Sequence, residues 1–224
     1  MHICCRDGVI MKKPDIYIVG ININKQYAYS LSKEADPADR YVRVVHGIYF
    51  RASIPAEQLF ETYGFRITRQ LLANAALTHS TAWYKRPTDG RIFVGGAYPY
   101  HRTVGDKVGD FAIVQSMISQ RSNQLLTDML NDRRLYYPFT VTDPMGSFDM
   151  HCATDEMILL SMFDSTKANK EKHLPQVEMN KLLEDLLLKH GDMPRLLVLL
   201  REIAEEIGKV NEYNRALKSL LTIK

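Results

Sequence analysis

The stretch RYVRVVHGIYFRA, residues 40–52, decides how the N-terminal part of this chain folds. Four of its apolar residues have the period-two spacing of β-strands, namely Val42, Val44, Ile48 and Phe50. Gly47 can take the positive φ that a tight turn or bulge requires. The stretch therefore predicts two strands joined by a kink, in a hairpin without any acidic residue. Such a hairpin is either a basic element that contacts nucleic acid or one edge of a small sheet.

The residues before this hairpin predict a strand and then a helix. Residues 15–24 (DIYIVGININ) alternate apolar with polar or small residues, which is typical of a strand. Residues 25–36 have room for about three helical turns before Pro37. We expect residues 1–55 to form an N-terminal segment of strand, helix and wing-like β-hairpin, as in a degenerate winged domain.

Residues 56–150 predict a mixed α/β body. Apolar residues of 56–77 recur at helical spacing and predict one amphipathic helix, or two helices divided at Gly64. Further along we expect a strand at 91–95 after the turn residues Asp89-Gly90, short strands and turns over 95–117, a helix at 120–134, and a strand at 136–143.

Residues 151–224 predict a helical bundle that packs on this body. Thr154 can cap a first helix, and Pro175 and Pro194 mark the first turns of the next two. A fourth helix is expected over 211–221. The predicted fold class is α+β, a small mixed sheet with an N-terminal hairpin and C-terminal helices.

Composition is that of an ordinary globular protein. The chain has 224 residues, 46% of them hydrophobic and 25% charged, with a net charge of +3. Residues 151–224 carry 11 Lys and Arg against 12 Asp and Glu, so the remaining 18 and 14 make residues 1–150 mildly basic. This balance gives no strong indication of a nucleic-acid partner.

Cysteine use argues against disulfide and zinc chemistry. Cys4 and Cys5 are adjacent, Cys152 is far away, and an odd count does not build a disulfide framework. No apolar run approaches the roughly 18 residues that span a bilayer, and the N-terminus shows no long apolar signal segment. We expect a cytoplasmic protein that contacts no membrane.

The search for a catalytic motif mostly fails, because the phosphate-loop, nucleophile-elbow and metalloprotease patterns are all missing. His79-Ser80 is more simply read as part of a capped helix start than as a base and nucleophile. Asp143 with Asp149, or Asp155 with Glu156, could bind a metal, but helix capping and the helix dipole explain acidic residues near a helix start better than a metal site does. We therefore expect no metal, no cofactor and no enzyme activity.

Two groups of residues are candidates for binding. The first is a group of arginines that could contact DNA phosphates. Alternatively, these arginines are the charges that protect the edge of a sheet from pairing with another strand. An aromatic and cationic run has the composition of a partner-binding surface, unless Trp83 serves the core. The DNA-binding candidates are Arg40, Arg43, Arg51, Arg66 and Arg69, and the partner-binding candidates are Trp83, Tyr84, Lys85 and Arg86.

Four segments, taken in order, resemble the AbiEi-type antitoxin family over roughly residues 40–220. They are RYVRVVHGIYFRA (40–52), ANAALTHSTAWY (73–84), GRIFVGG (90–96) and ATDEMILLSMFDS (153–165). The resemblance implies a non-enzymatic antitoxin of a type IV toxin–antitoxin system, with a winged domain that binds operator DNA and a C-terminal part that counters a toxin. The family's winged domain has about three helices before its hairpin, whereas here only residues 25–36 predict a helix. We therefore interpret the hairpin first as part of a sheet.

Two other classes of function stay open. One is a metal-dependent nuclease or hydrolase that uses Asp143, Asp149 and His79. The other is an inhibitory protein-binding module encoded by a phage or mobile element, with the hairpin as a sheet edge open to a partner strand. The oligomeric state and the identity of a toxin partner do not follow from the sequence.

Overall fold

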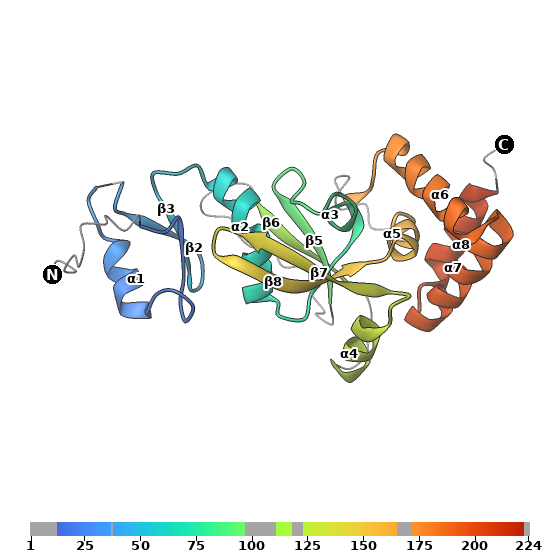
Figure 1. The fold of residues 1–224 in the computed structure, drawn as a ribbon, viewed down its shortest axis with the longest axis horizontal. Coiled ribbons are helices and arrows are strands. Elements are labelled where there is room, and N and C mark those ends of the chain that lie inside the picture. The colour runs from blue at the N-terminus through green and yellow to red at the C-terminus, as the bar shows by residue number, and fades with distance from the viewer. Residues whose placement is uncertain (1–12, 37, 97–110, 118–122, 165–171, 222–224) are drawn as a thin grey trace. The chain divides into compact units, whose positions relative to one another are not determined.

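The computed structural model describes residues 13–36, 38–96, 111–117, 123–164 and 172–221. Contacts divide them into two compact units, with the described residues up to Leu59 in unit 1 and those from Phe60 onward in unit 2. Helices and two small sheets make the fold α+β, as the sequence predicts, with helices at its C-terminal end (Figure 1).

Unit 1 contains the predicted hairpin within a three-stranded antiparallel sheet. Gly47 at the turn has a φ of +79°, and its carbonyl accepts from the Val19 amide at 2.8 Å. The helix packs Ala28 and Leu31 against tyrosines of the sheet. The elements are β1 (Ile16–Ile18), α1 (Lys25–Leu31), β2 (Tyr41–Val45) and β3 (Ile48–Arg51), in the sheet order β1-β3-β2.

The first strand and the first helix are both shorter than predicted. The Asn22 side chain accepts from the Ile18 amide at 2.7 Å and donates to the Ile16 carbonyl at 3.0 Å. These bonds turn the chain after three strand residues, where the sequence pattern predicts a strand over 15–24. Helix α1 begins at the predicted residue but ends at Leu31 rather than at 36.

Unit 2 is built on a five-stranded mixed sheet of order β6-β5-β4-β8-β7. β5 pairs parallel with β6 and β4 parallel with β8, while the β4–β5 and β7–β8 pairs are antiparallel. Its strands and the helices between them are β4 (Ala76–Leu77), α3 (His79–Tyr84), β5 (Arg91–Gly96), β6 (Ala112–Met117), α4 (Asn123–Asn131), β7 (Tyr136–Asp143) and β8 (Gly146–Ala153).

One continuous helix, α2 (Ala56–Leu71), packs on this sheet, so the alternative of two helices is excluded. Gly64 lies where the helix approaches β5, because a Cβ built there would come within 2.7 Å of Ile92 Cδ1. Stacked rings of Phe60 and Phe111, with centroids 5.0 Å apart, join the same helix to the residue just before β6. The glycine therefore serves close packing rather than a break.

One prediction for unit 2 was wrong, and one strand was missed. The helix predicted to reach residue 77 ends at Leu71, since the buried Ala76 and Leu77 form β4, the central strand of the sheet. Strand β8 was not predicted at all, because GSFDMHCA (146–153) lacks clear apolar alternation. It forms because each of its residues pairs with β7 across the turn that ends at Gly146.

The C-terminal helices follow the prediction closely. Thr154 caps the first of them by accepting from the Met157 amide, and Asp192 caps the third through the Arg195 amide at 2.9 Å. Leu197, Ala216 and Leu220 form a small core between the last two helices. The helices are α5 (Asp155–Ser161), α6 (Gln176–His190), α7 (Met193–Ile207) and α8 (Val210–Leu220).

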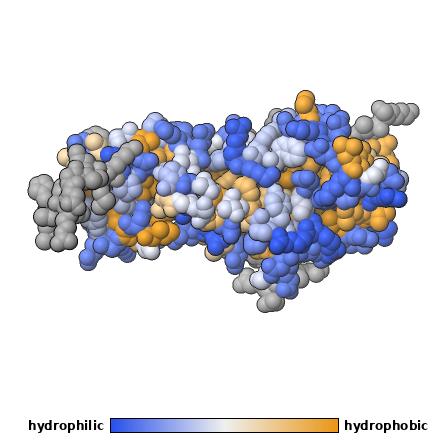
Figure 2. Space-filling model, in the orientation of Figure 1, coloured by the Kyte–Doolittle hydropathy of each residue, from blue (hydrophilic) through white to orange (hydrophobic). Residues whose placement is uncertain are grey.

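Exposed apolar side chains remain on these helices. Val177 and Leu188 on α6 and Val198 on α7 are each more than half exposed. Figure 2 shows apolar surface over this end of unit 2. None of the described helices has the length and apolarity needed to cross a membrane. Cys4, Cys5 and most of the turns predicted over 95–117 lie outside the described residues.

Candidate functional site

Among the described residues of unit 2, the segment from Thr78 to Ala82 is the most deeply buried polar stretch. It joins the central strand β4 to α3, and the Thr78 amide donates to the Phe93 carbonyl of β5 at 3.0 Å. Thr81 Oγ1 accepts from the Phe93 amide at 2.9 Å. These two bonds fix the start of α3 to the sheet. His79, which lies between Thr78 and Thr81 in the sequence, has a side chain that is 4% exposed.

His79 has a φ of +52°, in the left-handed region that non-glycine residues rarely adopt. Such a backbone costs on the order of 1–3 kcal/mol and persists only where the surroundings impose it. Its imidazole Nδ1 lies 2.9 Å from Thr78 Oγ1. The bonds of Thr78 and Thr81 to β5 are the constraint that holds this conformation.

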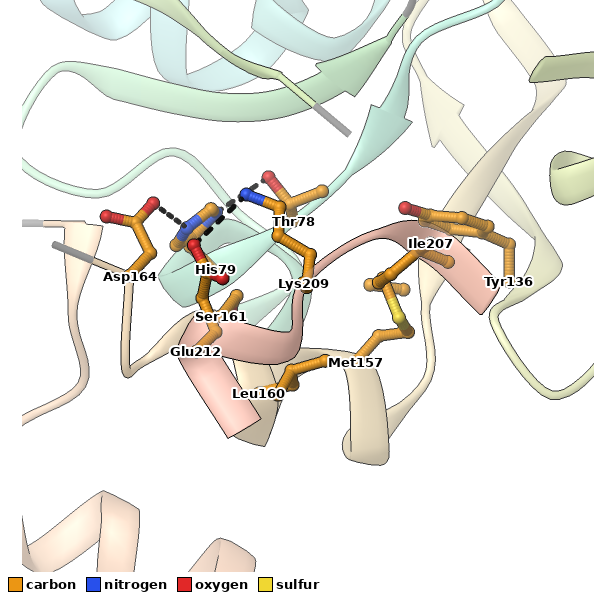
Figure 3. A pocket seen from close by; sticks show the side chains of 11 residues that line it. Thr78, His79, Tyr136, Met157, Leu160, Ser161, Asp164, Ile207, Lys209 and Glu212 are labelled. Atoms are coloured by element: carbon orange, nitrogen blue, oxygen red, sulfur yellow. Dashed lines mark hydrogen bonds and ion pairs between the residues drawn. The ribbon is translucent and has the colours of Figure 1, made fainter. Parts of the chain in front are cut away.

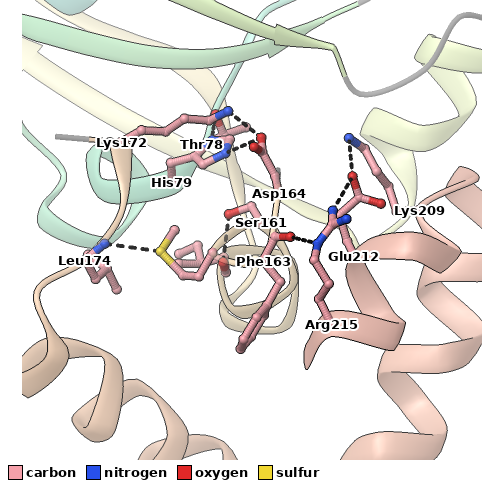
Figure 4. A network of polar contacts seen from close by, with 12 residues as sticks. Thr78, His79, Ser161, Phe163, Asp164, Lys172, Leu174, Lys209, Glu212 and Arg215 are labelled. Atoms are coloured by element: carbon pink, nitrogen blue, oxygen red, sulfur yellow. Dashed lines mark hydrogen bonds and ion pairs between the residues drawn. The ribbon is translucent and has the colours of Figure 1, made fainter. Parts of the chain in front are cut away.

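An ion pair lies on the other side of the ring, as Figure 4 shows. The Nε2 atom of His79 is 3.6 Å from Asp164 Oδ2, which is too long for a hydrogen bond but close enough for electrostatic attraction. The same carboxylate oxygen accepts from the Nζ atom of Lys172, a lysine whose side chain is almost wholly buried. Asp164 thus lies between the lysine and the histidine.

Burial lowers the pKa of His79 to about 4, so the ring is neutral at neutral pH. Asp164 acts in the opposite direction, whereas the Lys172 charge lowers the histidine pKa further. With a carboxylate facing Nε2, the proton of the neutral ring is favoured on Nε2, and Nδ1 then accepts from the Thr78 hydroxyl. The cluster therefore carries one ion pair and one neutral, oriented imidazole.

A cavity of about 50 Å³ borders this cluster (Figure 3). Its walls include Met157, Leu160 and Ile207. Tyr136 also lines it, and its buried hydroxyl has no hydrogen-bond partner in the described part of the chain. Burial raises the pKa of this tyrosine far above its ordinary value. A space of this size has room for about one or two waters, so it is too small for a metabolite.

Ser161, the remaining hydroxyl of the cavity wall, is no activated nucleophile. Its Oγ donates to the Ile158 carbonyl of its own helix at 2.7 Å. Within the described residues, no three His, Cys, Asp or Glu side chains are grouped so that they could hold a metal ion. The cluster therefore acts as a structural clamp that joins α3, the end of α5 and the residues just before α6.

The residues of the predicted hydrolase site are not brought together into such a group. Asp143 pairs with Arg66, with Nε to Oδ2 at 2.6 Å and a second bond to Oδ1 at 2.8 Å. Asp149 accepts from Thr140 Oγ1 at 2.7 Å. His79 is enclosed in the clamp. Each side chain has a structural partner instead of a shared metal.

The two arginines predicted for DNA on α2 hold that helix to the β7–β8 hairpin. Arg66 also donates to the Gly146 carbonyl at 2.7 Å, and its guanidinium lies over the Phe148 ring at 4.5 Å. Arg69 donates to the Asp149 carbonyl at 2.7 Å. Sequence analysis missed this role because it missed β8, which supplies these partners.

The hairpin arginines of unit 1 differ from one another. Arg43 pairs with Tyr49 and Arg51 with Tyr41 across the ladder, so the two arginines lie on the same face. Arg51 donates to the Ala38 carbonyl at 3.1 Å. Arg40 has a buried Nε without a described partner, whereas Arg43 is exposed. Whether any of them contacts DNA stays a prediction.

Of the predicted partner-binding residues, Trp83 has a structural contact. Its indole Nε1 donates to Glu178 Oε2 on α6 at 2.8 Å, which ties α3 to that helix. Tyr84 is half-buried, and Lys85 and Arg86 are exposed at the end of α3. These last three residues remain candidates for contact with a partner.

Asp164, Lys172 and Tyr136 are the site residues that sequence analysis missed. Asp164 follows an amphipathic helix and Lys172 lies in a polar run, where solvent exposure is the ordinary expectation. No sequence signal pairs them, because their link to His79 is made through tertiary structure. Comparison of the chain with protein-family models, with curated proteins and with solved structures finds no match.

Proposed function

We propose that this chain is a non-enzymatic regulatory protein of the antitoxin type, cytoplasmic, that acts by binding another protein. The observation that supports this most is that each residue predicted for a hydrolase site already bonds to another residue of the protein. Asp143 forms a bidentate ion pair with Arg66, Asp149 accepts a hydrogen bond from Thr140, and His79 is buried in the clamp. A catalytic acid or base must reach its substrate, whereas the side chains of Asp143 and His79 are only 2% and 4% exposed; Asp149 is exposed but bonds to Thr140.

The surface of unit 2 supports a protein partner. Exposed apolar residues on a helical surface are typical of protein interaction sites when they gather on one end of a molecule. Leu188 and Val198 are of this kind on α6 and α7, and the cationic Lys85 and Arg86 follow α3. The resemblance of the sequence to AbiEi-type antitoxins points to a toxin as the partner, with a nucleotidyltransferase-like toxin as the family's usual counterpart.

Operator DNA binding is the second part of the proposal. Arg43, exposed on β2, is the candidate phosphate contact among the hairpin arginines. Before the hairpin the described residues contain one helix, the seven-residue α1, so the usual recognition helix has no evident counterpart there. The hairpin would then contribute phosphate contacts without base readout, and affinity should fall steeply as salt rises.

Co-expression tests the protein-binding function. The product of the gene adjacent to this one is expressed alone and together with the full chain, and growth and co-purification are measured. We expect growth arrest by the adjacent product alone, relief by this chain, and a stable complex of the two. A neighbour that neither arrests growth nor co-purifies would contradict the proposal.

An assay for enzyme activity tests the same proposal from the other side. The purified chain is incubated with DNA and RNA in the presence of Mg²⁺ or Mn²⁺, beside the variants Asp143→Asn and His79→Asn. We expect no turnover with any of the three proteins. Metal-dependent cleavage by the wild type that both variants lose would overturn the non-enzymatic interpretation in favour of a nuclease.

A further inference from the structure

A second and much larger cleft lies in unit 2, separate from the small cavity beside His79. It measures about 550 Å³, within the range of roughly 300–1,000 Å³ that is typical of small-molecule sites. Residues from the first turns of α2, from α3, from the α3–β5 loop and from the residues just before α6 form its walls. Tyr84 and Arg86 of these walls are also candidates for contact with a protein partner, but contact with a partner surface does not by itself require a cleft of this size.

The walls of this cleft carry charges of both signs. Arg86 contributes a cation that has no hydrogen bond or ion pair to any described residue, and its guanidinium lies 5.9 Å from the Tyr84 ring centroid. Glu61 and Asp89 contribute two carboxylates, and both side chains are exposed. A polyanion would be repelled by the carboxylates, whereas a ligand with one charge of each sign would be complementary to the whole set.

Two polar atoms in the walls lack protein partners. Thr88 Oγ1 and His173 Nε2 are buried, and neither has a hydrogen-bond partner in the described part of the chain. Buried polar atoms are almost always satisfied, by protein, water or ligand. Both residues line the cleft, and their two unsatisfied atoms lie buried behind its surface, where a small movement of either side chain would bring them to the cleft's contents.

The cleft also has an apolar side. Tyr84 presents an aromatic ring, and Pro87 and Pro175 add two rigid apolar rings. Polar and apolar surface contribute about equally to the walls, so the cleft suits a ligand that has both kinds of surface. An aromatic or aliphatic side chain would bury its surface here while its charged groups meet the cation and the carboxylates.

We propose that this cleft binds a zwitterionic small molecule of the amino-acid class. Its carboxylate would pair with Arg86, its ammonium with Glu61 or Asp89, and its apolar side chain would lie against Tyr84 and the prolines. A phosphate-bearing ligand is disfavoured by the two carboxylates. This inference does not depend on the identity of a protein partner or on DNA binding.

Calorimetric titration of the full chain with four probes tests the proposal. L-Phenylalanine has both charges, 3-phenylpropionate only the carboxylate, phenethylamine only the ammonium, and inorganic phosphate neither an ammonium nor an apolar body. We expect L-phenylalanine to bind at least about tenfold more tightly than either single-charge analogue, since each charge-assisted hydrogen bond contributes at least about that factor. Equal binding of an analogue, tighter binding of phosphate, or no binding of L-phenylalanine would overturn the proposal.

Variants of exposed residues locate the site without threatening the fold. The single variant Arg86→Gln removes the cation. The double variant Glu61→Gln with Asp89→Asn removes both carboxylates. Asn is chosen at residue 89 because it tolerates the positive φ of that residue. We expect each variant to bind L-phenylalanine about tenfold or more weakly than the wild type, while the melting temperature of the protein stays unchanged. Arg195→Gln, at an exposed arginine of α7 that does not line this cleft, is the matched control. Undiminished affinity in Arg86→Gln would exclude this cleft as the binding site.

Discussion

At the scale of single residues, His79 shows how a buried polar group is stabilised in this protein. Its left-handed backbone is unfavourable, and its burial would be costly if the ring were charged. The ring avoids the second cost by remaining neutral, and the Thr78 hydroxyl satisfies its Nδ1 atom. The nearby charge of Asp164 is matched by Lys172 rather than by the histidine. The stability of the clamp should therefore depend on pH through His79.

The first prediction concerns this pH dependence. Because the His79 pKa is about 4 in the folded protein and near 6.5 when unfolded, the unfolded state binds a proton first as pH falls. The histidine's contribution is thus complete above pH 6.5 and is lost between about 6.5 and 4, by roughly 3 kcal/mol. In His79→Asn this loss should be absent, whatever the variant's stability at neutral pH.

Urea unfolding of wild type and His79→Asn at several pH values between 4 and 7 measures the difference. His151 and His173 also have pKa values lowered by burial, so both proteins should keep a shared residual slope. The test is the difference between the two proteins in the slope of unfolding free energy against pH. Parallel curves over this interval would show that His79 titrates normally and that the clamp does not keep it neutral.

The second prediction separates the two kinds of arginine. Arg66→Ala would leave the Asp143 carboxylate, whose side chain is 2% exposed, without its cation, and should lower the free energy of unfolding by about 3 kcal/mol. Arg43→Ala removes an exposed side chain and should change it by less than about 0.5 kcal/mol. Chemical denaturation measures both values. A stable Arg66→Ala protein would mean that the ion pair with Asp143 contributes little to the fold.

At the scale of elements, the sequence predicted those parts whose signal is local. The β2–β3 hairpin follows from alternation and Gly47, and the last three helices follow from Pro175, Pro194 and apolar spacing. Elements defined by tertiary pairing were missed. β4 has two residues and is a strand only because β5 and β8 flank it, and β8 depends on its ladder with β7. The clamp around His79 was missed for the same reason, since its members come from three separate segments.

The third prediction tests the contact between α2 and β5. Gly64→Ala places a methyl group 2.7 Å from Ile92 Cδ1. This overpacking should cost about 1–3 kcal/mol, partly offset by the roughly 1 kcal/mol that alanine contributes in a helix. Ile92→Val removes that same Cδ1 atom and alone should cost about 0.5–1.5 kcal/mol. In the double variant the two changes should compensate, so that it is more stable than the sum of the single effects indicates.

A double-mutant cycle by chemical denaturation gives the coupling energy, which we expect to favour the double variant by about 1 kcal/mol. Gly64→Ala combined with Ile113→Val is a suitable control, because Ile113 is equally buried but is not among the three residues nearest to a Cβ at residue 64. Strict additivity in the Gly64–Ile92 cycle would show that the helix shifts to admit the methyl group.

At the scale of the whole molecule, the division into two units separates the two proposed binding activities. The hairpin with Arg43 belongs to unit 1, whereas Lys85, Arg86 and the exposed apolar residues of α6 and α7 belong to unit 2. Each unit has its own sheet and its own core contacts. A substitution of an exposed residue in one unit should therefore leave the activity of the other unchanged.

The last prediction is this separation of functions in the full chain. Arg43→Ala should weaken binding to a labelled promoter fragment and reduce the slope of log affinity against log salt by about 1, because one phosphate contact is lost. It should leave relief of growth arrest unchanged.

The double variant Lys85→Asn with Arg86→Ala should weaken binding of the toxin partner by on the order of tenfold, while promoter binding stays the same. Fluorescence anisotropy at two salt concentrations and co-expression growth curves measure the two activities in the same set of proteins. If either variant impaired both activities equally, while its melting temperature matched that of the wild type, the assignment of the activities to separate units would be wrong.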